Sequence, residues 1–235
     1  MNTYFLTGTA LCWIFLKAVN LDGIKMIRKF AICAFLAAAI APCTARPPDM
    51  HHSALRMLVQ SCNFLLTDAL HGSISTPSQE NNFESSGYSA TIRVFGSEKS
   101  FGFNFLCHSQ FKNVNEIAEN YGGHFEFVTN KWVPSFPGAS ADEISRLRKV
   151  TKIFSLDSKN GHGFYMIQDE TVGEPHRRIR HFSYCLFHET KAICGLGDVK
   201  RLADAQSDML PYALQILKSV EFTDTPAETS KSANP

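Results

Sequence analysis

Two cysteines that face each other across a predicted hairpin constrain the fold of this chain more than any other feature. Cys185 lies in the segment 181–188 and Cys194 ends the segment 191–194, and the composition of both segments predicts strands that flank the short turn 188–191. Counting outward from this turn in an antiparallel pair places residue 185 opposite residue 194. Directly opposite residues have Cβ atoms ~4.5–5.5 Å apart, close to the ~3.5–4.5 Å that a disulfide requires. The register therefore predicts antiparallel β-structure and a Cys185–Cys194 disulfide.

Cys62 and Cys107, the other two cysteines beyond residue 45, are paired by elimination. In the segment 53–70, Cys62 shares one face of a predicted helix with several apolar residues. Cys107 continues an alternation of phenylalanines that begins at Phe101, on the buried face of a strand. Both thiols thus point to the core, so we expect either a second disulfide or two buried free cysteines. A zinc site is disfavoured because neither pair has a CxxC spacing or a histidine at a ligand spacing.

The segment 26–45 has the three parts of a secretory signal peptide in order. Arg28 and Lys29 give it a basic start, an apolar run covers 30–41, and small residues precede a cleavage position before Arg46. The apolar run is shorter than the about 20 residues that a membrane-spanning helix needs. We therefore expect export to the periplasm or the medium, where an even number of cysteines favours disulfides.

A second apolar stretch precedes this signal and leaves two interpretations open. Residues 1–25 are either a wrongly assigned extension, with Met26 as the true start, or an extra apolar segment. The rival interpretation is a membrane hairpin, in which residues 1–45 are retained and tether the protein. A lipoprotein anchor at Cys43 is disfavoured because Pro42 precedes that cysteine. Beyond the leader we expect one domain over 46–222 and a disordered tail over 223–235.

The pattern along the chain predicts an α+β domain in which an antiparallel β-sheet is flanked by helices. Asn160-Gly161 gives the strongest local hairpin signal, and Ser140 with Glu143 forms a predicted helix cap. The expected elements are a helix at 53–70, a loop at 71–87, strands at 88–95 and 101–108, a helix at 113–121, a strand at 124–132, a helix at 144–150, strands at 152–157 and 163–168, the cysteine hairpin, a helix at 204–219 and a short strand at 220–222.

From Phe101 to Phe222 this order resembles the PsbP-like fold of lumenal and bacterial envelope proteins. The resemblance rests on the strand 101–107 that leads into a helix, on the segment 160–165 that opens a later strand, and on the ending 213–222, where a last helix runs into a short strand. It implies a central antiparallel sheet flanked by helices. The fold also occurs in immunity proteins that neutralise toxins delivered by type VI secretion, which implies an exported protein that binds a partner without catalysis. The resemblance assigns no functional residue.

The sequence predicts no catalytic residue, no metal ligand and no cofactor. Its nine histidines lack the spacing of a metal site, and His108 follows Cys107 on a strand, so the two side chains face opposite sides. Asp169 and Glu170 are likewise adjacent, which disfavours a glycosidase pair. There is no G-x-S-x-G motif and no complete glycine-rich phosphate loop.

Two groups of residues are candidates for partner binding. Arg177, Arg178 and Arg180 form the densest charge run, and their alternative role is a solvated strand start. Trp132 and Phe136 lie in a loop bounded by prolines, where rigid aromatic side chains anchor protein contacts or close the end of a core. Residues 46–235 hold 19 Lys and Arg against 21 Asp and Glu, and this balance gives no electrostatic case for a nucleic-acid partner or an anionic membrane surface.

We therefore expect an exported, non-catalytic binding protein with a protein partner of unknown identity. An immunity-type inhibitor of a secreted toxin is one concrete form of this function. One alternative is an envelope hydrolase whose site is assembled from distant residues such as His162, His181 and His188. The other is a membrane-tethered envelope protein with a structural role, which contacts the membrane only if residues 1–45 are retained.

Overall fold

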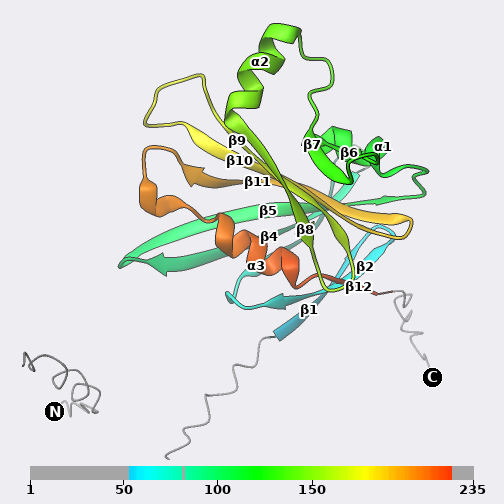
Figure 1. Cartoon of the computed structure of the whole chain (residues 1–235). Coiled ribbons are helices and arrows are strands. Elements are labelled where there is room, and N and C mark those ends of the chain that lie inside the picture. The colour runs from blue at the N-terminus through cyan, green and yellow to red at the C-terminus, as the bar shows by residue number, and fades with distance from the viewer. Residues whose placement is uncertain (1–52, 81–82, 224–235) are drawn as a thin grey trace, which may run out of the picture. The chain divides into compact units, whose positions relative to one another are not determined.

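A computed structural model describes residues 53–80 and 83–223, and these residues form mostly antiparallel β-sheet with three short helices (Figure 1). The predicted leader, the segment before it and all of the tail except Thr223 lie outside the described residues. The elements are β1 (Ser53–Val59), β2 (Cys62–Asp68), β3 (Ser73–Glu80), β4 (Phe83–Val94), β5 (Ser97–Ser109), α1 (Val114–Ala118), η1 (Glu119–Tyr121), β6 (Gly123–Glu126), β7 (Lys131–Pro134), α2 (Ala141–Val150), β8 (Thr151–Asp157), β9 (His162–Asp169), β10 (Ile179–His188), β11 (Lys191–Arg201), η2 (Ala205–Ser207), α3 (Leu210–Lys218) and β12 (Glu221–Phe222).

A seven-stranded antiparallel sheet organises the described chain. Its strand order is β3-β4-β5-β11-β10-β9-β8, and two smaller sheets, β1-β2-β12 and β6-β7, accompany it. Each strand of the large sheet pairs antiparallel with its neighbours. The expected α+β class with an antiparallel sheet is therefore confirmed.

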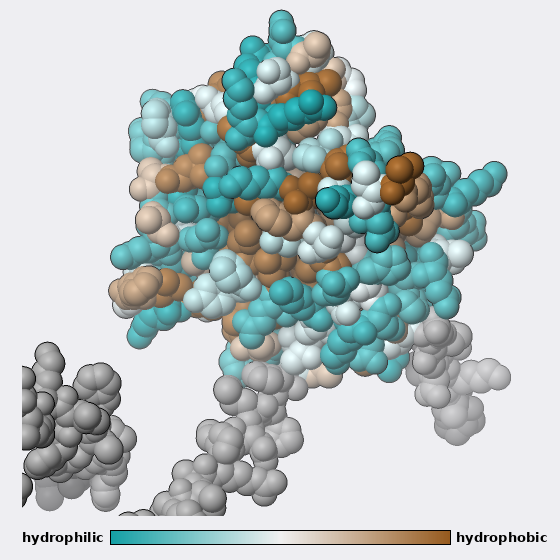
Figure 2. All heavy atoms as spheres, in the orientation of Figure 1, coloured by the Kyte–Doolittle hydropathy of each residue, from teal (hydrophilic) through white to brown (hydrophobic). Residues whose placement is uncertain are grey.

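One face of the large sheet, the packed face, is covered by α3 and by the small sheet β1-β2-β12. Strand β5 presents alternate phenylalanines to this core, and β10 adds Phe182 and Tyr184 at positions two residues apart, as the period of a strand requires. Helix α3 contributes Ala213, Ile216 and Leu217. Figure 2 views this side and shows hydrophobic residues gathered over the strands next to α3, with hydrophilic residues around them.

The opposite face of the sheet is covered over only part of its area. Helix α1, the turn η1 and the hairpin β6–β7 pack on the portion formed by β8, β9, β10 and one end of β11. The side chains buried there include Phe164, Cys185, Phe187 and Cys194. The hydroxyl of Ser183 donates to the carbonyl of Tyr121 at 2.9 Å, which ties η1 to the middle of β10.

Both predicted disulfides are present, one on each face. Cys185 faces Cys194 across β10 and β11 with a Cα–Cα distance of 4.1 Å, in the register that counting from the turn predicts. Cys62 and Cys107 join β2 to β5 with a Cα–Cα distance of 5.7 Å. The two disulfides indicate a protein that matures in an oxidising environment.

The local signals in the second half of the chain predict its elements correctly. Ser140 and Glu143 form a reciprocal capping box at the start of α2. The amide of Asn160 donates to the carbonyl of Phe222 and accepts from its backbone N–H, at 2.9 and 2.8 Å, so the β8–β9 turn also holds β12 in place. The last helix begins later than expected, at Leu210, because Pro211 fits only the first turn of a helix.

The helix expected at 53–70 is wrong, because this segment forms the hairpin β1–β2. Met57 pairs with Phe64 across the two strands, and both side chains are buried. Leu58, which a helix would have placed on its apolar face, is instead 47% exposed. The leucine spacing fits a period of 3.6 and a period of two about equally well, and pairing with β12 together with the Cys62 disulfide favours the strands.

Two further expectations in the first half are corrected. The predicted loop at 71–87 contains β3 and the start of β4, because hydroxyl residues such as Ser73 and Ser89 pair across these strands at a solvent-facing surface. The single strand expected at 124–132 is the hairpin β6–β7, which turns at Asn130 with a φ of 55°.

Candidate functional site

The uncovered part of the second sheet face, which we call the open face, is hollowed into two adjoining grooves. The larger has a volume of about 660 Å³ and crosses β4, β5, β11 and β10. The smaller, of about 450 Å³, continues toward β3, and Ser89 and Ser100 line both grooves. Residues of this face in the two linings are Ser73, Ser89, Thr91, Ser100, Gly102, His181, Leu196 and Asp198.

Small side chains make the open face shallow. The hydroxyl groups of Ser73 and Ser89 lie 2.9 Å apart, and those of Thr91 and Ser100 lie 2.8 Å apart, so they satisfy one another across the strands. Gly102 leaves the backbone open, because a Cβ at this position would lie 3.1 Å from the carbonyl oxygen of Tyr88. A bound molecule can therefore approach the strand backbone closely over β4 and β5.

One large apolar side chain of the open face stands in the larger groove. Leu196 is 53% exposed, and its backbone N–H donates to the side-chain oxygen of Asn104 at 2.6 Å. The backbone carbonyl of Asn104 in turn accepts at 2.8 Å from the hydroxyl of Tyr184, whose ring belongs to the packed face. This region of β5 and β11 is thus fixed from both sides, and it presents Leu196 on a rigid backbone.

His181 closes one side of the larger groove. Its Nδ1 lies 2.9 Å from an Asp198 oxygen, and its Nε2 lies 3.1 Å from a Glu170 oxygen. With an N–H on each ring nitrogen, the His181 imidazole donates to both the Asp198 and the Glu170 carboxylate. The pKa of Glu170 is lowered, first by the hydrogen bond that it accepts from the backbone N–H of Ile179 and then by His181.

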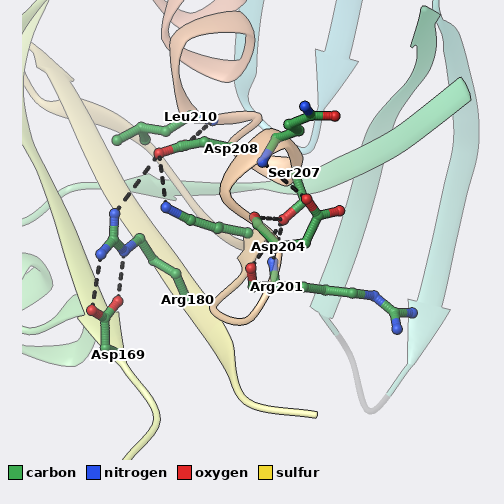
Figure 3. A network of polar contacts seen from close by, with 9 residues as sticks. Asp169, Arg180, Arg201, Asp204, Ser207, Asp208 and Leu210 are labelled. Carbon is green, nitrogen blue, oxygen red and sulfur yellow. Dashed lines mark hydrogen bonds and ion pairs between the residues drawn. The ribbon is translucent and has the colours of Figure 1, made fainter. Parts of the chain in front are cut away.

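Arg180, a predicted partner-binding residue, belongs to an ion-pair network at the end of β9 and β10 (Figure 3). Its guanidinium lies against the Asp169 carboxylate, with Nη2 donating at 2.9 Å, and only 21% of its side chain is exposed. Asp208 lies 3.9 Å from both Arg180 and Lys200. The hydrogen bond from Arg180 lowers the pKa of Asp169, and the same bond raises the pKa of Arg180.

Ser207 fixes the loop that leads from β11 to α3, as Figure 3 also shows. Its hydroxyl accepts from the backbone N–H of Arg201 at 2.9 Å and lies 2.7 Å from the carbonyl of Asp204. Lys99 binds the Asp204 carboxylate at 2.8 Å and lowers its pKa. These contacts hold the start of α3 against the sheet, which is a structural role.

The other two predicted arginines lie on the loop between β9 and β10. Arg178 donates to the carbonyl of Gly173 at 2.9 Å, and Arg177 pairs with Glu174 at 3.1 Å. The structure thus separates Arg180, which is enclosed in its network, from two arginines that stabilise their own loop. None of the three lines the grooves of the open face.

Trp132 packs inside the hairpin-covered part of the second face. Its ring centroid lies 4.7 Å from that of Phe164 and 5.8 Å from that of Phe187, so it closes the end of the core. Phe136 is half-buried in the loop before α2. The exposed apolar residues of this hairpin are instead Phe127 and Val128 at its tip.

The histidines named for a hydrolase site do not converge. His162 pairs with Phe187 in the strand register and His181 pairs with Gln168, so they lie toward opposite ends of the β9–β10 pair. His188 lies on the other face, where its ring stacks on Phe222. Within residues 53–80 and 83–223, no three histidine, cysteine or acidic side chains form a metal-binding group.

His108 and Cys107 face opposite sides of β5, as the strand period predicts. Cys107 is in its disulfide, whereas His108 Nε2 lies 2.8 Å from the hydroxyl of Tyr121 beneath η1. Burial lowers the pKa of His108 and raises the pKa of Tyr121 to about 12.

The glycines at 163 and 195 also have structural explanations, since a Cβ at Gly163 or Gly195 would collide with a neighbouring strand backbone.

No protein-family model matches this chain, and no curated protein matches it either. In the described part of the chain, the helices are all too short to cross a bilayer.

The sequence analysis did not predict the open face. The sequence does indicate a polar side of β5, because Ser100, Gly102 and Asn104 alternate with the phenylalanines of this strand. What the alternation did not reveal is where α1 and the β6–β7 hairpin stop covering the sheet.

Proposed function

We propose that this chain is an exported, non-catalytic binding domain whose protein partner docks on the open face of the large sheet. Export is supported by the signal-like segment 26–45 and by the two disulfides, which form in oxidising compartments. A partner-binding role without catalysis is also what the resemblance to PsbP-like immunity proteins implies. An inhibitor of a secreted toxin is the concrete form that we favour.

The observation that carries this proposal is the uneven cover of the second sheet face. The same strands β10 and β11 are buried beneath η1 at Cys185 and Cys194 but bare at His181 and Leu196. The bare part has adjoining grooves, an exposed leucine on a rigid backbone and a rim of polar groups. A central apolar contact with a polar surround is the usual arrangement of a protein interface.

The charges around the groove favour a protein over an anionic polymer as the partner. Asp198 and Glu170 stand beside His181, and Arg93 near the tip of the β4–β5 hairpin is paired with Glu98. A nucleic acid would require a cluster of cations that face the ligand. The charges of both signs around this groove instead complement the polar residues that surround the centre of a protein interface.

The binding function ranks ahead of the hydrolase alternative because His162, His181 and His188 lie at three separate places on the sheet. A site assembled from distant residues requires side chains that meet around one reacting atom. The membrane-tethered alternative depends on residues 1–45, and N-terminal sequencing of the mature protein that begins at Arg46 would exclude it.

The test is capture of the partner by variants of the open face. Leu196→Arg and Ser100→Arg each place a long charged side chain in the groove, and Val172→Arg is a matched control on the β9–β10 loop. Quantitative mass spectrometry of proteins retained from envelope extract should show one protein that wild type and the control hold equally and that both groove variants lose at least tenfold. Equal retention by all four proteins, or no retained protein with wild type, contradicts the proposal.

A further inference from the structure

The tip of the β4–β5 hairpin carries an exposed phenylalanine that packs on neither buried cluster. Phe95 is 84% exposed, and it is absent from both clusters although its neighbour Val94 packs against one of them. Figure 1 shows this hairpin extending beyond the other strands, with its turn at the far left. The side chain is therefore presented to solvent at the end of the longest hairpin among the described residues.

The backbone at this tip is unfavourable for phenylalanine. Phe95 has a φ of 47° and Gly96 a φ of 84°, so both central residues of the two-residue turn are left-handed. Turns of this kind favour Asn-Gly, because asparagine and glycine tolerate a positive φ. A bulky aromatic residue with a positive φ is a genuine outlier that requires a reason.

The other described non-glycine residues with a positive φ do not have an apolar side chain. Six non-glycine residues in the described part of the chain have a positive φ, and five of them carry polar side chains: Gln60, His71, Gln110, Asn130 and Glu189. Phe95 is the one apolar member of the described set. In the hairpin turns at Gln60 and Glu189 only the first central residue has a positive φ, and that residue is polar. A positive φ at the first turn position therefore does not require an aromatic side chain in this fold.

We infer that Phe95 is the anchor side chain by which the β4–β5 hairpin inserts into an apolar pocket of the protein partner. A local departure from both burial and backbone preference is found where a binding role maintains it. Exposed aromatic side chains are the usual anchors of protein interfaces, because one rigid ring buries a large apolar area.

The surroundings of Phe95 favour a protein pocket over a membrane surface. Arg93 and Glu98 flank the tip and form an ion pair at 3.2 Å, so the rim around the ring has no net positive charge. A single aromatic residue beside an ion pair with no net charge gains little from anionic lipid headgroups. An apolar pocket with a polar edge complements both the ring and its paired rim.

This inference rests on the proposed function and extends its interface from the groove to the hairpin tip. Strands β4 and β5 carry Thr91 and Ser100 in the groove wall, and the tip begins four residues beyond Thr91. Four strand residues span about 13 Å. A partner seated in the groove therefore reaches Phe95 without any movement of this chain.

The first test needs only the purified protein. Phe95→Asn gives the turn the Asn-Gly pair that its backbone favours, so the midpoint of thermal unfolding should rise by about 2–4 °C. Glu189→Asn is the control, because its turn already carries a polar residue, and it should raise the midpoint less. A fall in the midpoint for Phe95→Asn would show that Phe95 stabilises the fold and would overturn the inference.

The second test places the photo-crosslinker p-benzoylphenylalanine in the full chain, in its native host, at position 95, 100 or 172. Val172 is the matched control, since it is also 84% exposed but lies on the β9–β10 loop. We expect one and the same protein to be crosslinked from positions 95 and 100 and not from 172, with the adduct of position 95 on apolar residues of that protein. Purified, this protein should bind Phe95→Asn at least tenfold more weakly than wild type.

The outcomes separate the two proposals. Crosslinking from position 100 but not from 95, or undiminished binding by Phe95→Asn, overturns the anchor role and leaves the groove as the binding site. Lipid adducts at position 95 overturn it in favour of a membrane contact. If positions 95 and 100 crosslink only the same proteins as position 172, both the anchor role and the proposed function are overturned.

Discussion

Strand β5 serves the two faces of the large sheet with alternate residues, and over residues 100–105 the two sets differ in chemistry. Phe101, Phe103 and Phe105 point to the packed face, where they meet α3 and the small sheet. Ser100 and Gly102, between and beside them, line the groove of the open face. Stability and surface properties therefore depend on neighbouring positions of one strand, so a single substitution can change one without the other.

The largest effect is expected from removing a ring on the packed face. Phe105 is fully buried, and its ring centroid lies 5.3 Å from those of Phe64 and Phe103. Phe105→Ala should lower the free energy of unfolding by about 3–5 kcal/mol, because it leaves a cavity between two sheets. Denaturant unfolding measures it, with Ser100→Ala as the control on the opposite face, expected within about 0.5 kcal/mol of wild type. Equal losses for both variants would remove the distinction between the faces.

The two disulfides also differ between the faces, since each one links strands on a different face of the large sheet. The Cys62–Cys107 bond has a sequence separation of 45 and the Cys185–Cys194 bond one of 9. Loop-closure entropy predicts a loss of about 4 kcal/mol for Cys62→Ala with Cys107→Ala, and about 2.6 kcal/mol for Cys185→Ala with Cys194→Ala. Denaturant unfolding of the two double variants should keep this order, and the reverse order would contradict it.

A smaller effect is expected at the Asp169–Arg180 pair, which lies outside both buried clusters. The pKa of Asp169 is lowered in the folded state, so the pair stabilises the fold above the unfolded pKa of about 3.9 and loses this effect as the pH falls through the lower, folded pKa. Asp169→Asn should cost about 1.5 kcal/mol near neutral pH.

The measurement for this pair is unfolding of wild type and Asp169→Asn across a pH series from neutral to strongly acidic. The difference between the two proteins should shrink toward zero at the acidic end. A difference that stays constant throughout the series would mean that the carboxylate charge contributes nothing.

How far the sequence predicts this molecule depends on whether a signal is local. The cysteine register and the Asn160-Gly161 turn are set by a few adjacent residues, so the hairpins of the second half were predicted. The segment 53–70 has an apolar spacing that a helix and a hairpin share, and partners far away in the sequence, Cys107 and β12, decide between them.

The candidate site was harder to predict for the same reason. Trp132 and Arg180 have the residue types of partner anchors, but whether they are exposed depends on the segments that pack on them, here Phe164 and Asp169. The open face exists because α1 and the β6–β7 hairpin cover only part of one sheet face. Phe95 could have been noticed from sequence alone, since Phe-Gly stands where a tight hairpin turn favours Asn-Gly.

The most direct test of this division between the faces is a paired measurement on Leu196→Arg. Because Leu196 is half exposed in the groove, we expect a free energy of unfolding within about 0.5 kcal/mol of wild type, together with at least a tenfold loss of the protein retained from envelope extract. Unchanged retention by a fully folded Leu196→Arg variant would contradict docking of a partner on the open face. A loss of stability as large as that of Phe105→Ala would contradict the division between the two faces.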